Sequence, residues 1–179
     1  MLGMVVTEFC EMVETAFSPE LLDRILMRAG LASGGAYTAV GQYPHEEMQR
    51  LVAELARETE TPAPALLEAF GEYLFPRLVE QHPRAIEHCD SLLSLLDRLD
   101  ATIHPAVRRL YPAAELPSFT TLVREKDRIT LAYRSSRRLE SLAVGLIRGA
   151  ARHFGRAVEV TLEAPEGAAE VRIHVRLVR

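Results

Sequence analysis

Apolar side chains recur at helical spacing from the start of the chain. In residues 1–17 they follow one another three or four positions apart, which places them on one face of an α-helix. They are Val5, Val6, Phe9, Met12, Val13 and Phe17. A second helix is predicted over 19–30, because a serine-proline pair opens this segment and a glycine closes it. The glycine-rich stretch 31–44 is expected to be a loop.

Helical spacing continues to residue 112. One helix is predicted from about His45 to Thr59, and another over 65–82, where Gly71 or Pro76 could bend it. A further apolar face extends over 84–104, and 105–112 continues it as a helix that Pro112 ends.

After Pro117 the pattern changes to alternation of apolar and polar residues. Residues 119–135 have the pattern of two strands joined by a charged turn at Lys126-Asp127. Residues 157–178 alternate again, with a turn at Pro165-Glu166-Gly167. Between the two hairpins, a helix is predicted over 140–155. The predicted class is therefore α+β: helices first, then a four-stranded, mostly antiparallel sheet with helices on one face.

Length and composition suit one globular domain. The chain has 179 residues, of which 48% are hydrophobic and 26% charged. A net charge of −4 gives no reason to expect nucleic-acid binding. The arginines between positions 124 and 156 could serve an anionic ligand or a partner, or could form a solvated basic face. They are Arg124, Arg128, Arg134, Arg137, Arg138, Arg148, Arg152 and Arg156.

Two features point to a cytoplasmic location without membrane contact. The N-terminus has acidic residues where a signal peptide needs a basic start and a long apolar run. No later apolar stretch approaches the roughly 20 residues that span a bilayer. Cys10 and Cys89 cannot make a disulfide framework.

Motifs that would indicate an enzyme are missing. The sequence has no GxSxG elbow, P-loop, HExxH or dinucleotide-binding glycine fingerprint, and we expect no catalysis. Among the six histidines, His104 lies in an apolar segment beside Ile103 and Val107. From the residues alone, it is better explained as a hydrogen-bonded core histidine than as a ligand.

Three separated segments form a recognisable combination. IHPAVRRLYPAAELPSF places His104 before a helical turn and an LYP-x-A-x-LP-x-F pattern. AYRSSRRL contains Tyr133, Ser135 and Arg137, and LAVGLIRGAARHFG follows. In these segments, and across essentially the whole chain, the sequence resembles the bacterial heme nitric oxide/oxygen binding (H-NOX, HNOB) family.

The resemblance implies a haem site. In the H-NOX fold, a helical distal part (about 1–60) precedes a proximal part with the sheet (about 61–179). His104 would be the proximal ligand of a haem b iron, although Pro105 means that the ligand helix either begins at His104 or is kinked there. Tyr133, Ser135 and Arg137 would hold the propionates, and would share one face if the strand continued to Arg137.

The resemblance also implies which gas binds. Leu142 occupies the position where oxygen-binding members carry a tyrosine, and bound dioxygen needs such a donor. We therefore expect a sensor that responds to nitric oxide and excludes oxygen. The other residues expected to line this pocket are Val5, Phe9, Leu74, Leu78 and Leu146.

Three further expectations follow from the family. Pro117 and Val5 match positions that press on the porphyrin, although Pro117 fits a simple loop proline equally well. Some members hold zinc in a Cys/His cluster, but Glu140 stands where one cysteine is expected, so we predict no zinc. Loss of the bond between iron and His104 would shift the helical part and signal to a separate effector, a histidine kinase or cyclic-di-GMP enzyme, because the chain ends soon after the last strand.

Other functions remain open. The fold could serve as a haem-free interaction module, or the protein could be a haem carrier or nitric oxide scavenger. We do not expect peroxidase chemistry, because the sequence offers no distal histidine or arginine to act as the acid–base residue.

Overall fold

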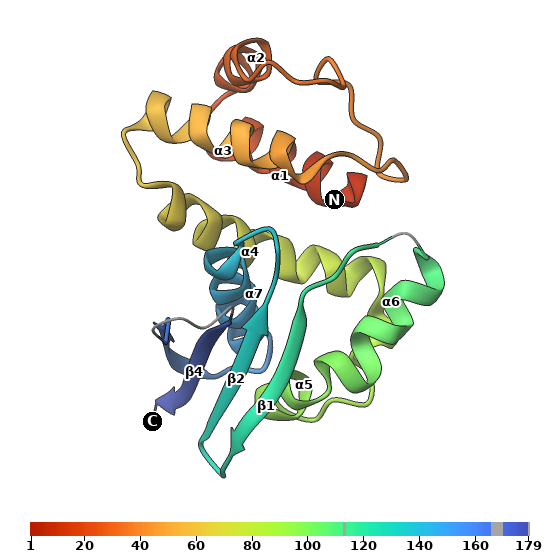
Figure 1. Ribbon diagram of the computed structural model, residues 1–179, viewed down its shortest axis with the longest axis vertical. Helices are drawn as coiled ribbons and strands as arrows, with labels where there is room; N and C mark the ends of the chain where they lie inside the picture. Colours follow the sequence, from red (N-terminus) through yellow and green to blue (C-terminus); the bar gives the residue numbers. More distant parts are fainter. Residues whose placement is uncertain (113, 166–169, 179) are drawn as a thin grey trace.

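The first three helices form a layer at one end of the molecule. The computed structural model describes residues 1–112, 114–165 and 170–178. Helices α1 (Gly3–Ala16), α2 (Pro19–Arg28) and α3 (His45–Thr59) lie above the rest of the chain in Figure 1. The loop between α2 and α3 is held by Glu47, whose carboxylate accepts hydrogen bonds from Ser33 and Tyr37. The predicted order of helix, helix, loop and helix is confirmed.

Two further helices, α4 (Ala63–Gln81) and α7 (Glu140–His153), pack backbone to backbone. A Cβ atom added at Gly71 would lie 2.5 Å from the carbonyl oxygen of Leu142, and one at Gly145 would overlap the backbone of Glu68. Glycine on both helices is therefore what allows this close approach. Helix α4 continues through Gly71 and Pro76, although the proline cannot donate to the carbonyl of Glu72.

The segment between α4 and the sheet contains several short helices. They are η1 (Pro83–Ala85), α5 (Leu92–Asp97), a π-helix labelled η2 (Leu99–Ile103) and α6 (His104–Leu110). The prediction of one helix over 84–104 was therefore wrong. Helix α5 starts afresh because the Ser91 hydroxyl accepts a hydrogen bond from the amide of Ser94, at 3.3 Å.

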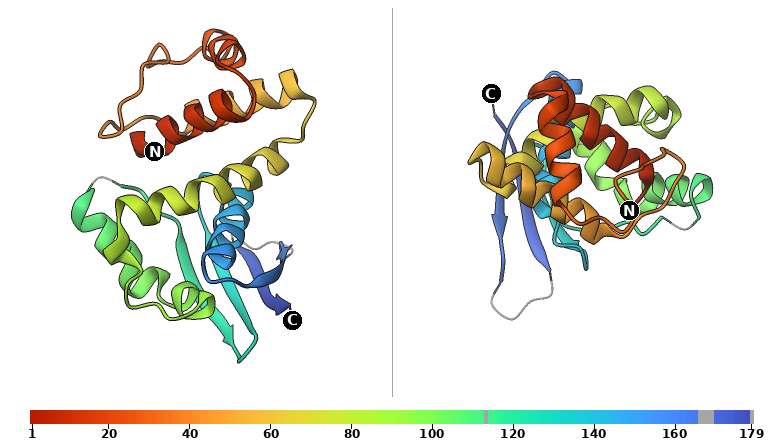
Figure 2. Two further views of the ribbon diagram at one scale, coloured as in Figure 1. Left: turned by 180° about the vertical axis from the view of Figure 1, so that it is seen from behind. Right: turned by 90° about the horizontal axis from the view of Figure 1, so that it is seen from above.

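The last part of the chain forms the predicted sheet. Strands β1 (Ser118–Arg124), β2 (Arg128–Arg134), β3 (Ala157–Glu163) and β4 (Val171–Val178) pair antiparallel in the order β1-β2-β4-β3. Helices α4, α5 and α7 lie on one side of it (Figure 2). Of the predicted turn at Pro165-Glu166-Gly167, Glu166 and Gly167 lie outside the described residues.

The core consists of two hydrophobic clusters. One joins α1, α2 and α3 to one face of α4 and to the start of α7, and includes Phe9, Phe70 and Leu142. The other lies between the sheet, α5 and α7, and includes Leu131 and Tyr133. Leu146 packs against both. The first cluster takes side chains from both sides of residue 60. The division of the chain at about that residue stays a prediction.

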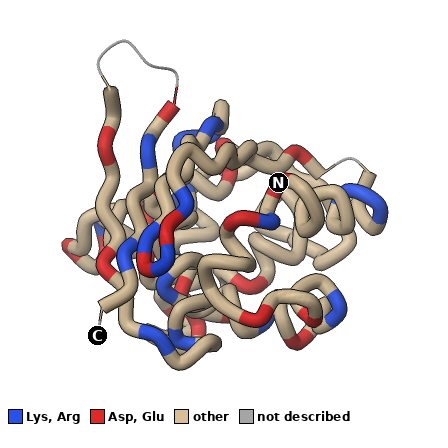
Figure 3. The backbone as a smooth tube through the Cα atoms, turned by 90° about the horizontal axis from the view of Figure 1, so that it is seen from below, with Lys and Arg blue, Asp and Glu red and all other residues tan. Residues whose placement is uncertain are grey.

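The charged residues are interspersed along the backbone (Figure 3). Several of the late arginines form ion pairs: Arg128 with Glu125, Arg134 with Glu170, Arg148 with Glu68 and Arg152 with Glu72. Much of the predicted basic stretch is thus neutralised locally. Within the described part of the chain, no helix is both long and apolar enough to cross a bilayer.

Candidate functional site

His104 is buried and held by one ring nitrogen. It is the first residue of α6, and 9% of its surface is exposed. Its Nδ1 lies 2.7 Å from Oδ1 of Asp100, one turn earlier on the π-helix. The other carboxylate oxygen, Oδ2, accepts a hydrogen bond from the amide of Phe119 on β1, at 2.7 Å. Asp100 therefore ties the imidazole to the sheet.

The hydrogen bond to Asp100 fixes the imidazole in the form that can bind a metal. A carboxylate can only accept, so Nδ1 carries the proton and the lone pair is left on Nε2. Burial lowers the pKa of His104, while the hydrogen bond to Asp100 raises it, and burial is the larger effect. The ring is thus neutral at neutral pH, and Nε2 has a lone pair that can bind a metal. Nε2 makes no hydrogen bond to any of the described residues.

Pro105 does not disturb this arrangement. Helix α6 begins at His104, which was one of the two expected geometries, and the proline falls in its first turn, where no amide donor is needed. His104 nonetheless has helical torsions (φ −61°, ψ −39°), although a residue before proline favours extended ones.

The three signature residues lie close in the chain but not on one strand face. Tyr133 is on β2, 4% exposed, with its ring centroid 5.2 Å from that of Phe119. Strand β2 ends at Arg134, so the condition that the strand holds through Arg137 is not met. Ser135 lies in a turn instead, where its hydroxyl accepts a hydrogen bond from the amide of Arg137, at 3.2 Å.

Arg137 is buried without a carboxylate beside it. Only 8% of its surface is exposed, and its Nη1 lies 3.9 Å from the thioether sulfur of Met1. Within residues 1–112, 114–165 and 170–178 no acidic group forms an ion pair with it. A guanidinium carries five donors and is unfavourable to bury without an anion. This position is suited to a ligand that brings its own carboxylate.

The six apolar residues predicted to line a gas pocket come together in one cluster. Phe9, Leu74 and Leu142 are buried in the first hydrophobic cluster, and Val5, Leu78 and Leu146 pack against it. Two come from α1, two from α4 and two from α7. Pro117 lies just before β1 and is partly buried.

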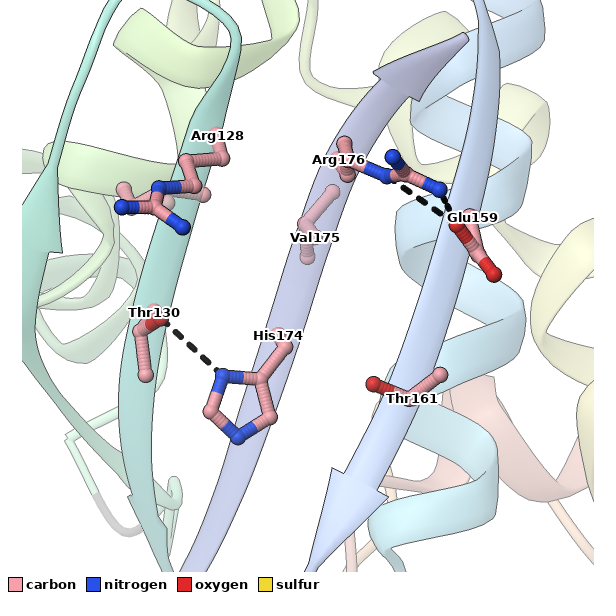
Figure 4. Close-up of a pocket in the computed structure, with 8 residues that line it drawn as sticks. Arg128, Thr130, Glu159, Thr161, His174, Val175 and Arg176 are labelled. Carbon is pink, nitrogen blue, oxygen red and sulfur yellow. Dashed lines mark hydrogen bonds and ion pairs between the residues drawn. The ribbon is translucent and has the colours of Figure 1, made fainter.

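A hollow of about 290 Å³ lies on the open face of the sheet (Figure 4). His174 bonds with Thr130 on one side and Glu163 on the other, and Arg176 pairs with Glu159. Its charged groups are thus paired with other side chains, and it offers no free reactive group comparable to His104.

The comparisons with known proteins agree with this geometry. The sequence profile described as haem-NO-binding matches residues 2–162. The chain belongs to the haem-NO-binding (H-NOX) family. A comparison with curated protein sequences found no match.

Solved H-NOX structures extend the likeness to the whole chain. An Fe(II) unliganded H-NOX protein from K. algicida is 30% identical, with a TM-score of 0.95, and covers 100% of this chain and 97% of its own. An H-NOX protein from S. oneidensis in the Fe(II)NO state is 25% identical, with a TM-score of 0.91, and covers 100% of both chains. An H-NOX mutant from T. tengcongensis, 18% identical with a TM-score of 0.84, shares the fold.

The residues of this H-NOX protein fit the haem that its family binds. His104 presents a free imidazole nitrogen, and Arg137 is a buried cation without an anion among the described residues. These two features match the two chemistries of a haem, its iron and its propionates.

The sequence analysis did not identify Asp100 as the hydrogen-bond partner of His104, although the spacing of the two residues indicates it. An aspartate four residues before a histidine on a helix can reach the ring, and histidines that bind metals usually donate their second ring N–H to such a partner. The spacing Asp100–His104 would have been enough to name it.

Proposed function

We propose that this H-NOX protein senses nitric oxide through a haem b bound by His104 and signals to a separate effector protein. The observation that carries the proposal is the state of His104, a buried neutral imidazole with Nδ1 bonded to Asp100 and Nε2 free. When bound, haem would supply an iron that binds nitric oxide, and His104 would be the residue that holds this iron.

Arg137, Tyr133 and Ser135 are the residues proposed to hold the propionates. Arg137 would supply the charge-assisted bonds, and its guanidinium already lies in a buried place. Burial raises the pKa of Tyr133, so its phenol keeps its proton at neutral pH and remains a donor. Pro117 and Val5 are proposed to press on the porphyrin.

The path for the signal is proposed to run from His104 to the sheet. Any displacement of the imidazole acts on Asp100, whose second carboxylate oxygen binds the Phe119 amide of β1. The ring of His104 also lies 5.7 Å from that of Phe119, centroid to centroid. A change at the ligand therefore reaches β1 through two contacts, and the helical part and the sheet part can shift relative to one another.

The pocket residues support a choice of nitric oxide over oxygen. All six side chains are hydrocarbon, so none can donate a hydrogen bond to bound dioxygen. Leu142 and Leu146 come from α7, where a tyrosine would supply such a donor. We propose no zinc and no enzymatic activity. The effector is proposed to be a cytoplasmic histidine kinase or cyclic-di-GMP enzyme, which nitric oxide-dependent co-purification would identify.

Titration with hemin tests the haem site. The wild-type protein should form a Soret band with one equivalent of hemin, and His104→Gly should lose it or regain it only with added imidazole. His88→Gly is the matched control, because the His88 side chain is 76% exposed. A Soret band that His104→Gly leaves unchanged would mean that another residue binds the iron, and no band in the wild type would favour a haem-free module.

A further inference from the structure

A charged group lies buried where α1 crosses α4. Glu8 on α1 is 8% exposed, and its Oε1 accepts a hydrogen bond from Nε2 of Gln81, at 3.0 Å. Its Oε2 lies 3.0 Å from Nε of Arg77. The guanidinium of Arg77 in turn stacks on the ring of Tyr73, with 3.4 Å from Cζ to the ring centroid. We call Glu8, Arg77, Gln81 and Tyr73 the α1–α4 polar cluster.

The cluster adjoins the proposed gas pocket on both helices. Glu8 immediately precedes Phe9 on α1, and Arg77 immediately precedes Leu78 on α4. The second contact between the helices is apolar, with the rings of Phe9 and Phe70 meeting edge to face at 5.2 Å. Phe70, Leu74, Leu78 and Gln81 repeat at helical spacing, so both contacts lie along one stripe of α4.

Stability alone does not explain a charged cluster here. Removing two ions from water offsets most of their attraction, and well-packed apolar residues do as well or better in such positions. Burial raises the pKa of Glu8, which reflects that unfavourable desolvation. Glu8 Oε2 and the Tyr73 hydroxyl, both buried, also find no hydrogen-bond partner among the described residues.

The polar cluster adds directional contacts between α1 and α4, which restrict how the two helices can be placed against each other. Apolar contacts are non-directional and let one helix slide or roll on another. The ion pair of Glu8 with Arg77 and the hydrogen bond from Gln81 both depend on the relative position of the two helices. Phe9 and Phe70 also meet between these helices, but their edge-to-face contact involves no charge.

We propose that Glu8 and Arg77 are positioning residues for the gas pocket: together they fix the register of α1 on α4, and hence where Val5 and Phe9 stand relative to Leu74 and Leu78. The inference rests on the proposed function, because it concerns the same pocket. It adds a determinant outside the pocket wall that sets the shape of the space beside the iron.

Amide hydrogen exchange of the haem-free protein tests the register directly. Glu8→Gln should make exchange in α1 about tenfold faster, because it leaves the partly buried Arg77 without its anion. Arg77→Lys, which keeps the charge, should restore most of the protection that Arg77→Met loses. Glu58→Gln is the matched control, because it breaks the ion pairs of Glu58 with Arg24 and Arg28 between α2 and α3 and leaves α1 untouched.

A spectroscopic measurement separates positioning from stability. In the double variant Glu8→Leu/Arg77→Met an apolar pair replaces the ions, so the denaturation midpoint should stay near that of the wild type. Its haem-loaded ferrous form, with carbon monoxide as the probe, should nevertheless show a broadened or displaced C–O stretching band. Glu58→Gln should leave that band unchanged.

Three results would overturn the proposal. They are unchanged α1 exchange in Glu8→Gln, a C–O band in the double variant identical to that of the wild type, and an equal change in the control. If the protein binds no haem, the proposed function fails, and the exchange measurement still decides whether the cluster fixes α1.

Discussion

The imidazole of His104 has two nitrogen atoms with different tasks. Nδ1 is committed to Asp100, and Nε2 is the atom left for a metal. An anionic acceptor on Nδ1 makes the ring a stronger ligand, because it stabilises positive charge on the imidazole. The properties of the proposed iron site therefore depend on Asp100 as well as on the ligand itself.

Asp100→Asn should weaken haem binding about 10- to 100-fold, which is the usual effect of removing the hydrogen-bond partner of a histidine that binds a metal. The neutral amide is a poorer acceptor, and it also loses part of its hold on the Phe119 amide. Titration with hemin measures the affinity. Asp97→Asn is the control, since Asp97 bonds only to Thr121 on β1 among the described residues. Equal affinities for the wild type and Asp100→Asn would show that Asp100 has a purely structural role.

Leu142→Tyr should convert the pocket to one that retains oxygen. Leu142 is 8% exposed and lies in the cluster proposed to face the iron. A phenol there would supply a hydrogen-bond donor in a dry site. The measurement is the lifetime of the oxygen complex in air. Leu142→Phe matches the ring without the hydroxyl, and if it behaved like Leu142→Tyr, space rather than hydrogen bonding would control oxygen binding.

The sequence was informative about residues whose chemistry is distinctive. His104 and Arg137, which the sequence singled out, are both buried with unmet bonding capacity. Glu8 was not found, because a single charged residue in an amphipathic helix is assigned to its solvated side. Its burial depends on Arg77 and Gln81, which lie far away in the sequence.

At the scale of elements, the close packing of α4 against α7 is the most constrained contact. Four of the six proposed pocket residues are on these two helices, so their contact sets most of the pocket. Glutamates of α4 and arginines of α7 form ion pairs along it. We therefore infer that the packing of α4 against α7 fixes most of the proposed pocket, and that the α1–α4 polar cluster positions α1 against it.

Gly145→Ala should destabilise the protein by about 1–3 kcal/mol, because the added methyl group overlaps the backbone of Glu68 and forces the helices apart. Alanine's better helix propensity offsets at most about 1 kcal/mol of this. Urea denaturation of the haem-free protein measures the free energy of unfolding. Ser141→Ala on the same helix is the control, and a Gly145→Ala protein as stable as the wild type would contradict the packing described.

Elements with a strong repeating pattern were predictable, and those decided by single hydrogen bonds were not. The His45–Thr59 helix and the four strands agree with their apolar periodicity. The break before Leu92 was not visible, because apolar residues continue on both sides of it and the Ser91 cap decides the start. The end of β2 at Arg134 was equally hidden, because the turn is made by Ser135 bonding to its own chain.

At the scale of the molecule, the two hydrophobic clusters meet at α4 and α7. The helical layer packs on α4, while the sheet packs on α5 and α7 (Figure 1). His104 connects to the sheet, whereas Val5 and Phe9 belong to the helical layer. A haem bound by His104 and facing these residues would contact both parts, which is why a change at its iron could move one relative to the other.

The absorption spectrum of the reduced, haem-loaded protein under argon, air and nitric oxide tests this account most directly. We expect a five-coordinate ferrous spectrum under argon, the same spectrum under air, and a new spectrum with nitric oxide that shows a five-coordinate complex without the His104 bond. A stable oxygen complex in air would contradict the apolar pocket. A spectrum that did not respond to nitric oxide, or no haem spectrum at all, would contradict the proposed sensor.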